Sequence, residues 1–173
     1  MLFNVSTLVQ EGIGATRRYD VKGFLVTEGR DQEPISGSAE LIRTKWGVLV
    51  RAQMTLEERE TCSRCLQPLQ EELSFDFEEE FLETADPHGI KPPPEVADRD
   101  AFKIDERQVL DLTEAVRQYR EASAVMKPLC RPDCKGLCSD CGLDRNTDEC
   151  RCEDGIIDSR WAALRSVISE GKE

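Results

Sequence analysis

The sequence lacks a long hydrophobic run, and its apolar stretches, such as residues 24–26 and 48–50, are far shorter than the roughly 20 residues of a transmembrane helix. We therefore expect no membrane span. The N-terminal region also lacks the continuous apolar segment of a secretory signal peptide, because polar and charged side chains interrupt it throughout. These two absences together predict a cytoplasmic protein.

Recognisable catalytic motifs are absent as well. The sequence contains no Gly-x4-Gly-Lys phosphate loop, no Gly-x-Gly-x2-Gly dinucleotide fingerprint and no Gly-x-Ser-x-Gly nucleophile elbow. Its single histidine, His88, lies in a proline-rich stretch, so a catalytic zinc site with histidine ligands is not expected. We predict that the protein is not an enzyme.

Basic residues are scarce, with 23 Lys and Arg against 35 Asp and Glu and a formal net charge of -12. This deficit argues against a general nucleic-acid clamp, because phosphate binding draws on Lys and Arg. Residues 1–51 are nearly balanced, with seven basic and six acidic side chains, and they hold the candidate contacts for RNA or a partner. These candidates are Arg17, Arg18, Lys22, Arg43, Lys45 and Arg51. The acidic remainder is better suited to a basic protein partner.

The eight cysteines are the most informative feature that is present. A reducing cytoplasm disfavours disulfides, so their grouped spacing indicates metal binding. Cys62 and Cys65 form a Cys-x2-Cys turn between two expected strands. The other cysteines follow between residues 130 and 152 as Cys-x3-Cys-x3-Cys-x2-Cys-x8-Cys-x-Cys. We predict that all eight are ligands, in two sets of four, for two Zn2+ ions.

The ligands can be divided between the two ions in more than one way. The favoured division places Cys138, Cys141, Cys150 and Cys152 in one local site, and Cys62, Cys65, Cys130 and Cys134 in the other. Gly142 frees the turn after the local Cys-x2-Cys. Loop-closure entropy grows slowly with length, so the other site can join distant segments. In the alternative, Cys130 and Cys134 replace another pair in the local site. Few hydrophobic residues lie between residues 130 and 152, so this segment should need metal to fold.

Three other uses of the thiols stay open. A thiol-disulfide oxidoreductase needs a low-pKa thiolate at a helix start, whereas Cys62 and Cys65 lie between strands with acidic sequence on both sides. Iron-sulfur clusters also use four thiolates each, and eight cysteines could hold two of them. A zinc-ribbon regulator would bind nucleic acid directly, with a steep dependence on salt.

Alternating apolar side chains predict strands in the first half of the chain. The alternation is clearest over residues 48–56 and 69–83, where hydrophobic residues recur at every second position. Shorter strands are expected over residues 19–27 and 38–44. A turn-rich stretch containing Pro34, Ser36 and Gly37 precedes the last of these. We expect an antiparallel sheet or a small open barrel.

The second half predicts helices on either side of the cysteine-rich segment. Asp111 and Glu114 resemble a capping box, and a helical stripe runs from Leu112 to Met126 before Pro128 ends it. A short terminal helix is expected near residues 159–168. The predicted fold class is α+β. Its parts are a mainly β domain at residues 1–83, a proline-rich linker at 84–100, and a zinc-binding region with the helices at 101–173.

Three blocks of the sequence resemble a known family. They are Cys-Ser-Arg-Cys-Leu with the acidic, aromatic strand after it, Pro-Leu-Cys-Arg-Pro-Asp-Cys-Lys-Gly-Leu-Cys-Ser-Asp-Cys-Gly, and Asp-Ser-Arg-Trp-Ala-Ala-Leu. Together they are similar to the bacterial YceD family of large ribosomal RNA subunit accumulation proteins. The resemblance implies a role in the accumulation of 23S rRNA and in assembly of the large ribosomal subunit. It also implies a precursor of that subunit as the partner, contacted through rRNA or a basic ribosomal protein.

Overall fold

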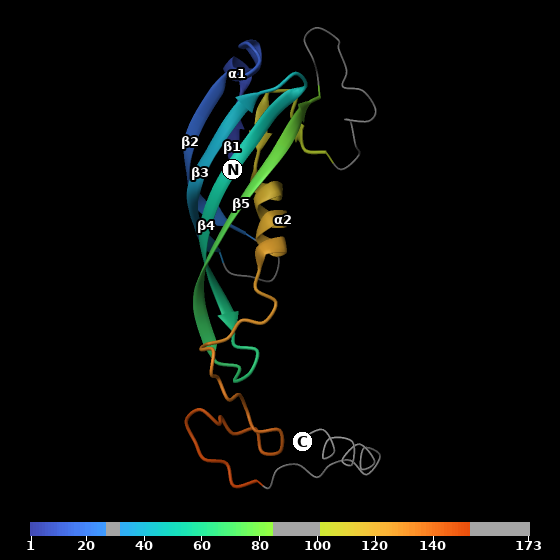
Figure 1. Ribbon diagram of the computed structural model, residues 1–173. Helices are drawn as coiled ribbons and strands as arrows, with labels where there is room; N and C mark the ends of the chain where they lie inside the picture. The colour runs from blue at the N-terminus through green and yellow to red at the C-terminus, as the bar shows by residue number, and fades with distance from the viewer. Residues whose placement is uncertain (27–31, 85–100, 153–173) are drawn as a thin grey trace, which may run out of the picture. The chain divides into compact units, whose positions relative to one another are not determined.

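The computed structural model describes residues 1–26, 32–84 and 101–152, which are mostly β-strand with few helices (Figure 1). The strands are β1 (Leu2–Asn4), β2 (Thr16–Leu25), β3 (Glu33–Arg43), β4 (Gly47–Thr61), β5 (Pro68–Glu83), β6 (Lys103–Ile104) and β7 (Val109–Asp111). The helices are α1 (Ser6–Gln10) and α2 (Thr113–Ser123). The predicted terminal helix, and the predicted linker apart from Thr84, lie outside the described residues.

The contacts divide the chain into two compact units. Unit 1 consists of Met1–Arg59 and Gln70–Met126, and unit 2 consists of Glu60–Leu69 and Lys127–Glu173. Unit 2 therefore contains the first cysteine pair together with the later cysteine-rich segment. The domain limits expected at residues 83 and 100 stay a prediction, because the segment between them is not described.

The strands form two open sheets. The larger has the order β2-β3-β4-β5-β6, and β1 pairs with β7 in a separate two-stranded sheet. Pairing is antiparallel from β2 through β4, as predicted, but the short β6 lies parallel to β5, which the sequence did not predict. Among the described residues the sheet does not close into a barrel. The expectation of a mainly β first half with an open sheet is confirmed.

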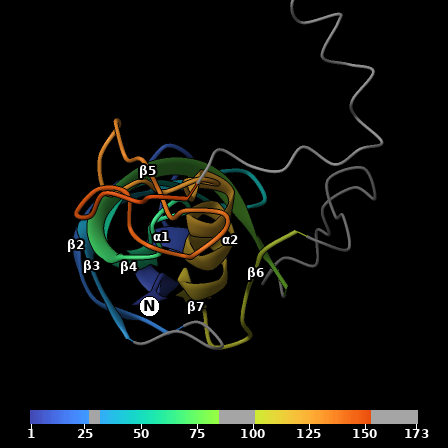
Figure 2. The same ribbon diagram turned by 90° about the horizontal axis from the view of Figure 1, so that it is seen from below.

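The side chains of β4 are buried at every second position, as the alternation in the sequence predicted. Its side chains at even positions from Val48 to Leu56 are buried, whereas Arg51 and Gln53 face away from the core. Phe75, Phe77 and Phe81 of β5 continue the same buried face. The larger sheet curves around α1 and α2, so both helices cover its buried side (Figure 2). Burial of this apolar face is what holds the sheet to the helices.

Helix α2 packs through Ala115 and Val116, and it begins and ends differently from the prediction. It starts at Thr113, whose backbone N–H donates to Asp111 Oδ1 at 2.9 Å. Glu114 does not complete a capping box, since its carboxylate accepts hydrogen bonds from Arg117 and Gln118. The helix ends at Ser123, and Met126 is 96% exposed, so its expected place on the buried stripe was wrong.

The turn expected at Pro34, Ser36 and Gly37 was also wrong, because these residues lie inside β3. They pair with Phe24, Lys22 and Val21 of β2, and the neighbouring β4 pairs with β3 on its other side. Pairing on both sides overrides the local preference for a turn. No helix in the described ranges is both long enough and apolar enough to cross a bilayer.

Candidate metal centres

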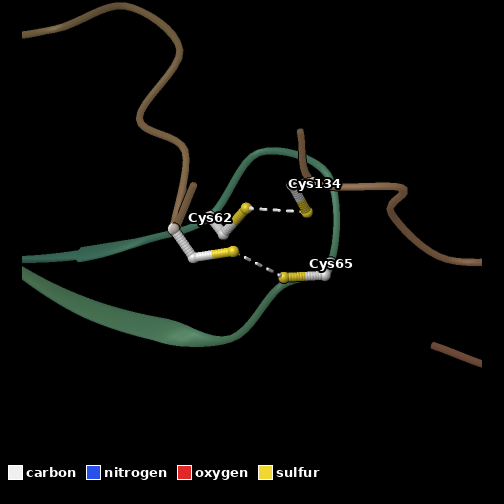
Figure 3. Close-up of side chains that lie close together, drawn as sticks. Cys62, Cys65 and Cys134 are labelled. Carbon is white, nitrogen blue, oxygen red and sulfur yellow. Dashed lines mark hydrogen bonds between the residues drawn. The ribbon is translucent and has the colours of Figure 1, made fainter. Parts of the chain in front are cut away.

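The first group of cysteines joins two distant parts of unit 2. Cys62 follows β4 and Cys65 precedes β5, whereas Cys130 and Cys134 follow α2 in the sequence. Cys62 Sγ lies 3.8 Å from Cys134 Sγ (Figure 3). Cys65 Sγ lies 3.6 Å from Cys130 Sγ. Cys62, Cys65 and Cys134 are buried. We call these four residues site A.

The second group is local and more open to solvent. Cys138, Cys141, Cys150 and Cys152 have Sγ atoms that all lie within 4.8 Å of one another, and we call them site B. Cys150 Sγ lies 3.3 Å from Cys138 Sγ and 3.6 Å from Cys141 Sγ. Cys141 and Cys152 are exposed. The eight cysteines therefore form two groups of four, in the division that the sequence favoured.

Each site begins with the same kind of turn. In site A, Cys62 N donates to Gln67 O at 2.9 Å, and Leu66 N donates to Cys62 O at 3.0 Å. In site B, Cys138 N donates to Leu143 O at 2.8 Å, and Gly142 N donates to Cys138 O at 3.0 Å. The residue after the second cysteine has a positive φ in both turns, 60° at Leu66 and 71° at Gly142. This geometry turns both sulfurs of a Cys-x2-Cys pair to the same side.

The distances between sulfurs agree with metal binding rather than with disulfides. A disulfide brings two sulfurs to about 2.05 Å, and all eight cysteines are free. Four thiolates around one Zn2+ at about 2.3 Å each stand about 3.8 Å apart in a tetrahedron. The closest sulfur pairs, at 3.3 to 3.8 Å, match that spacing. Both donor sets therefore fit a tetrahedral thiolate metal ion, and zinc is compatible with them.

The thiols of site A have divergent acidities. Backbone N–H groups of Cys130 and Cys65 donate toward Cys62 and lower the pKa of its thiol to about 6. Desolvation, followed by hydrogen bonds with the thiols of Cys65 and Cys134, raises the pKa of Cys130 to about 12. The Cys62 thiolate therefore forms easily, whereas burial and hydrogen bonds with neighbouring thiols hold the proton on Cys130. A divalent cation at the centre would favour the thiolate form of all four cysteines.

Site B repeats this electrostatic pattern. Backbone N–H groups of Cys141 and Asp140 lower the pKa of Cys138 to about 6. Hydrogen bonds with the thiols of Cys150 and Cys141 raise the pKa of Cys152 to about 12. The two sites thus have the same chemical requirement for a cation, although they differ in exposure.

Three residues that sequence reasoning missed support site A. Arg64 Nη1 donates to Cys134 O at 2.8 Å, and Leu137 N donates to Arg64 O at 3.1 Å. Gly136 has a φ of +73°, and a Cβ there would lie 3.0 Å from Arg64 O. Asn146 Nδ2 donates to Cys134 Sγ at 3.4 Å. Only the glycine offered a signal in the sequence, because glycine readily adopts the positive φ that a turn can require.

Most of the candidate RNA contacts lie beside carboxylates. Arg18 Nη2 lies 3.0 Å from Glu40 Oε1, and Arg51 Nε lies 2.5 Å from Glu78 Oε2. Arg43 Nη1 lies 2.6 Å from Glu83 Oε1, and Arg17 is paired with Glu11. The ammonium group of Lys45 lies over the Trp46 ring, 4.4 Å from its centroid, and Lys22 is exposed on β2. The structure therefore does not gather the six candidates into one basic patch.

The exposed face of the larger sheet is polar and partly acidic. Glu72, Asp76 and Glu78 of β5 point to solvent, in agreement with the alternating pattern of their strand. Two shallow hollows on this face share Ser38, Gln53 and Asp76 in their linings. Arg18 and Arg51 also line one hollow, each beside a carboxylate, so this face is a hydrogen-bonding surface of mixed charge with a small excess of carboxylates.

A comparison with models of protein families shows to which family the chain belongs. The model described as large ribosomal RNA subunit accumulation protein YceD matches residues 50–167. The chain belongs to this family. The match begins within β4 and covers both cysteine sites of the YceD protein described here, so the resemblance seen in the sequence is confirmed.

Curated relatives of this YceD protein occur in mycobacteria. The protein Mb2951c of Mycobacterium bovis and the protein Rv2926c of Mycobacterium tuberculosis, both described as uncharacterized, are each 30% identical to it over 122 residues. Each alignment covers 70% of this chain and 56% of the relative. The chain thus spans little more than half the length of these relatives. No solved structure matches it.

Proposed function

We propose that this YceD protein is a non-enzymatic, zinc-stabilised factor that assists assembly of the large ribosomal subunit and accumulation of 23S rRNA. The family match carries the proposal, because it spans both cysteine sites, the strands β5 and β6, most of β4, and helix α2. The protein acts in the cytoplasm on a precursor of the large subunit.

The metal part of the proposal rests on the donor sets. Two groups of four thiols, each with sulfurs within 4.8 Å of one another, suit two Zn2+ ions. In this proposal the eight cysteines hold the metal and supply no open coordination position, so the ions are structural. Zinc binding then supplies much of the folding free energy of unit 2, whose described residues contain little regular secondary structure.

The partner part of the proposal rests on charge. Four of the six candidate basic side chains lie against carboxylates, which lowers their value as phosphate ligands. One hollow on the exposed face of the sheet has Asp76 and Glu78 in its lining, and Glu72 is exposed on the same strand. Complementary charge favours a basic protein partner at this face, and ribosomal proteins of the large subunit have that chemistry.

A thiol-disulfide oxidoreductase is the second candidate, because the pKa of Cys62 is lowered to about 6 beside Cys65 in a Cys-x2-Cys turn. A low thiol pKa is a property of redox-active pairs as well as of metal ligands. Titration of native protein with a thiol reagent separates the two. Metal-bound cysteines react slowly until a chelator is added, whereas a redox pair reacts at once and cycles with a disulfide substrate.

Affinity purification from growing cells tests the ribosomal proposal. We expect mass spectrometry and RNA sequencing of the recovered material to show enriched precursors of the large subunit. Asp76→Lys should reduce this recovery, because it reverses a charge in both hollows. Glu106→Lys, an equal change at an exposed site away from the hollows, should not. Recovery of no ribosomal material by the unchanged protein would contradict the proposal.

A further inference from the structure

The loop between two ligands of site B returns to site A. Arg145 N donates to Gly136 O at 3.0 Å, and Leu137 forms a β-bridge with Asp144. Residues 144–146 lie between Cys141 and Cys150 in the sequence, yet they contact the segment that begins at Cys134. The two sites therefore share one piece of backbone structure within unit 2.

Asn146 makes the most direct link. Its Oδ1 accepts a hydrogen bond from Lys135 N at 2.7 Å, and its Nδ2 donates to Cys134 Sγ at 3.4 Å and to Asp144 Oδ1 at 2.6 Å. A backbone N–H can only donate, so the contact with Lys135 fixes which side of the amide carries the oxygen. Both Nδ2 hydrogens then face acceptors, one of which is a ligand sulfur of site A.

We propose that Asn146 is a positioning residue of site A, supplied by the loop of site B, and that it couples metal binding at the two sites. The inference rests on the proposed metal binding and extends it to the order and strength of loading. An N–H donated to a metal-bound thiolate offsets negative charge on the sulfur and orients it. Asn146 gives that donor to Cys134 only while its own loop is closed.

Metal at site B closes the loop. Cys141 and Cys150 flank the loop, and an ion that binds both of them fixes its two ends. Without that ion the loop has no covalent or metal tie, and the entropy of the open chain opposes the contact between Asn146 and Cys134. Loading site B thus raises the affinity of site A, and by thermodynamic reciprocity loading site A raises the affinity of site B by the same factor.

Stepwise Co2+ titrations of the full chain measure this coupling, with the thiolate-to-cobalt absorption band as the readout. Cys150→Ser with Cys152→Ser leaves site A alone, and Cys62→Ser with Cys65→Ser leaves site B alone. We expect the product of the two association constants in the unchanged protein to exceed the product from the single-site variants by about 10- to 100-fold, the usual size of such supporting contacts.

Asn146 variants assign the coupling to this contact. Asn146→Ala in the two-site chain should remove most of the factor, and in the chain that has only site A it should change the affinity little, because the contact is already lost. Asp148→Asn is the control, since its side chain lies in the same loop and, within the described part of the chain, accepts a hydrogen bond from Thr147 Oγ1 and none from Asn146. The Asp148→Asn variant should keep the coupling factor between the two sites.

The outcomes separate this inference from the proposed metal binding. Two bound Co2+ ions whose affinities are independent would overturn the coupling and leave the metal sites standing. An equal loss of Co2+ affinity at site A from Asn146→Ala, with and without site B, would also overturn the coupling, since Asn146 would then act on site A alone. A chain that binds no cobalt or zinc would instead contradict the metal proposal. The comparison of single-site and two-site chains holds even if an Asn146 variant fails to fold.

Discussion

The Sγ atoms of Cys65 and Cys130 lie 3.6 Å apart although 65 residues separate them in the sequence. This pairing places the turn between β4 and β5 beside the segment that follows α2. An ion held by both cysteines closes a long loop, and the entropy of that closure increases only slowly with loop length. One metal ion at site A can therefore fix a contact that the described backbone alone supports with few hydrogen bonds.

Removing two ligands of site A should release one metal ion and leave the other. We expect Cys62→Ser with Cys65→Ser to bind one zinc per chain where the unchanged protein binds two, because site B keeps all four of its thiols. Elemental analysis after gel filtration measures the ratio. Ser63→Ala in the same turn should keep both ions. Loss of both ions from the double variant, or of neither, would refute the division into sites A and B.

Gly136 and Gly142 should respond differently to alanine although both have a positive φ. A Cβ at Gly136 would lie 3.0 Å from Arg64 O, whereas one at Gly142 would have nothing within 4 Å. Gly142→Ala should cost only backbone strain of about 1 kcal/mol. Gly136→Ala should cost more and weaken zinc retention at site A. Competition with a chromophoric chelator measures the zinc affinity of both variants. Equal losses of affinity would contradict the close approach of Gly136 to Arg64.

Arg120 should matter much more to stability than Arg117 on the same helix. The Arg120 side chain is 3% exposed, with Nη2 3.2 Å from Glu33 Oε1 and Nε 2.7 Å from Glu58 Oε1. Arg120→Met removes the positive charge from buried carboxylates and should cost about 3 to 5 kcal/mol in the free energy of unfolding. Arg117→Met breaks exposed pairs with Glu114 and Glu121, which contribute little to stability because solvent screens them. Urea unfolding measures the loss in the free energy of unfolding for both variants. Similar losses would contradict the burial of Arg120 beside Glu33 and Glu58.

The sequence predicted those parts of the structure that repeat a pattern. Strands β4 and β5 were predictable because their apolar residues alternate over many positions. The three-residue strands β1 and β7 and the two-residue β6 are too short to show a period. Turn-forming residues in β3 gave the wrong signal, because its pairing with β2 and β4 decides its structure. The grouped spacing of the eight cysteines predicted the metal ligands but not the residues that support them.

There is a physical reason why the sequence did not predict the residues that support the metal sites. Asn146 stands in the run Asp-Arg-Asn-Thr-Asp, which is typical of an exposed turn. Its partner Cys134 is 12 residues away, so the contact depends on how the loop folds back. Arg64 likewise looked like a surface residue between two ligands, and only the folded unit shows its hydrogen bond to Cys134 O.

The carboxyl group of Glu114 should titrate at unusually low pH. Hydrogen bonds from Arg117 and then Gln118 lower its pKa from 4.5 to about 2. A depressed native pKa stabilises the folded state above the unfolded pKa, so this contribution should fade as pH falls from about 4.5 toward 2. The effect on stability is small because the group is exposed. NMR titration of the side chain measures its pKa, and Arg117→Met should raise that pKa. A midpoint near 4.5 in the unchanged protein would contradict the contact.

Binding of naked RNA by the isolated protein should be weak and only mildly dependent on salt, because Arg18 and Arg51 lie against Glu40 and Glu78. Glu40→Gln with Glu78→Gln frees both guanidinium groups and should strengthen binding. Fluorescence anisotropy with a labelled RNA at several salt concentrations gives the slope. Tight binding by the unchanged protein, with a slope equivalent to several phosphate contacts, would instead favour a zinc-ribbon regulator.

Metal analysis of natively purified protein tests the central claim most directly. Inductively coupled plasma mass spectrometry should find two zinc ions per chain, and all eight cysteines should react with a thiol reagent only after the zinc is chelated. A chain with no stoichiometric zinc, or with thiols that pass reversibly through disulfides in the native protein, would contradict the account of two structural metal sites.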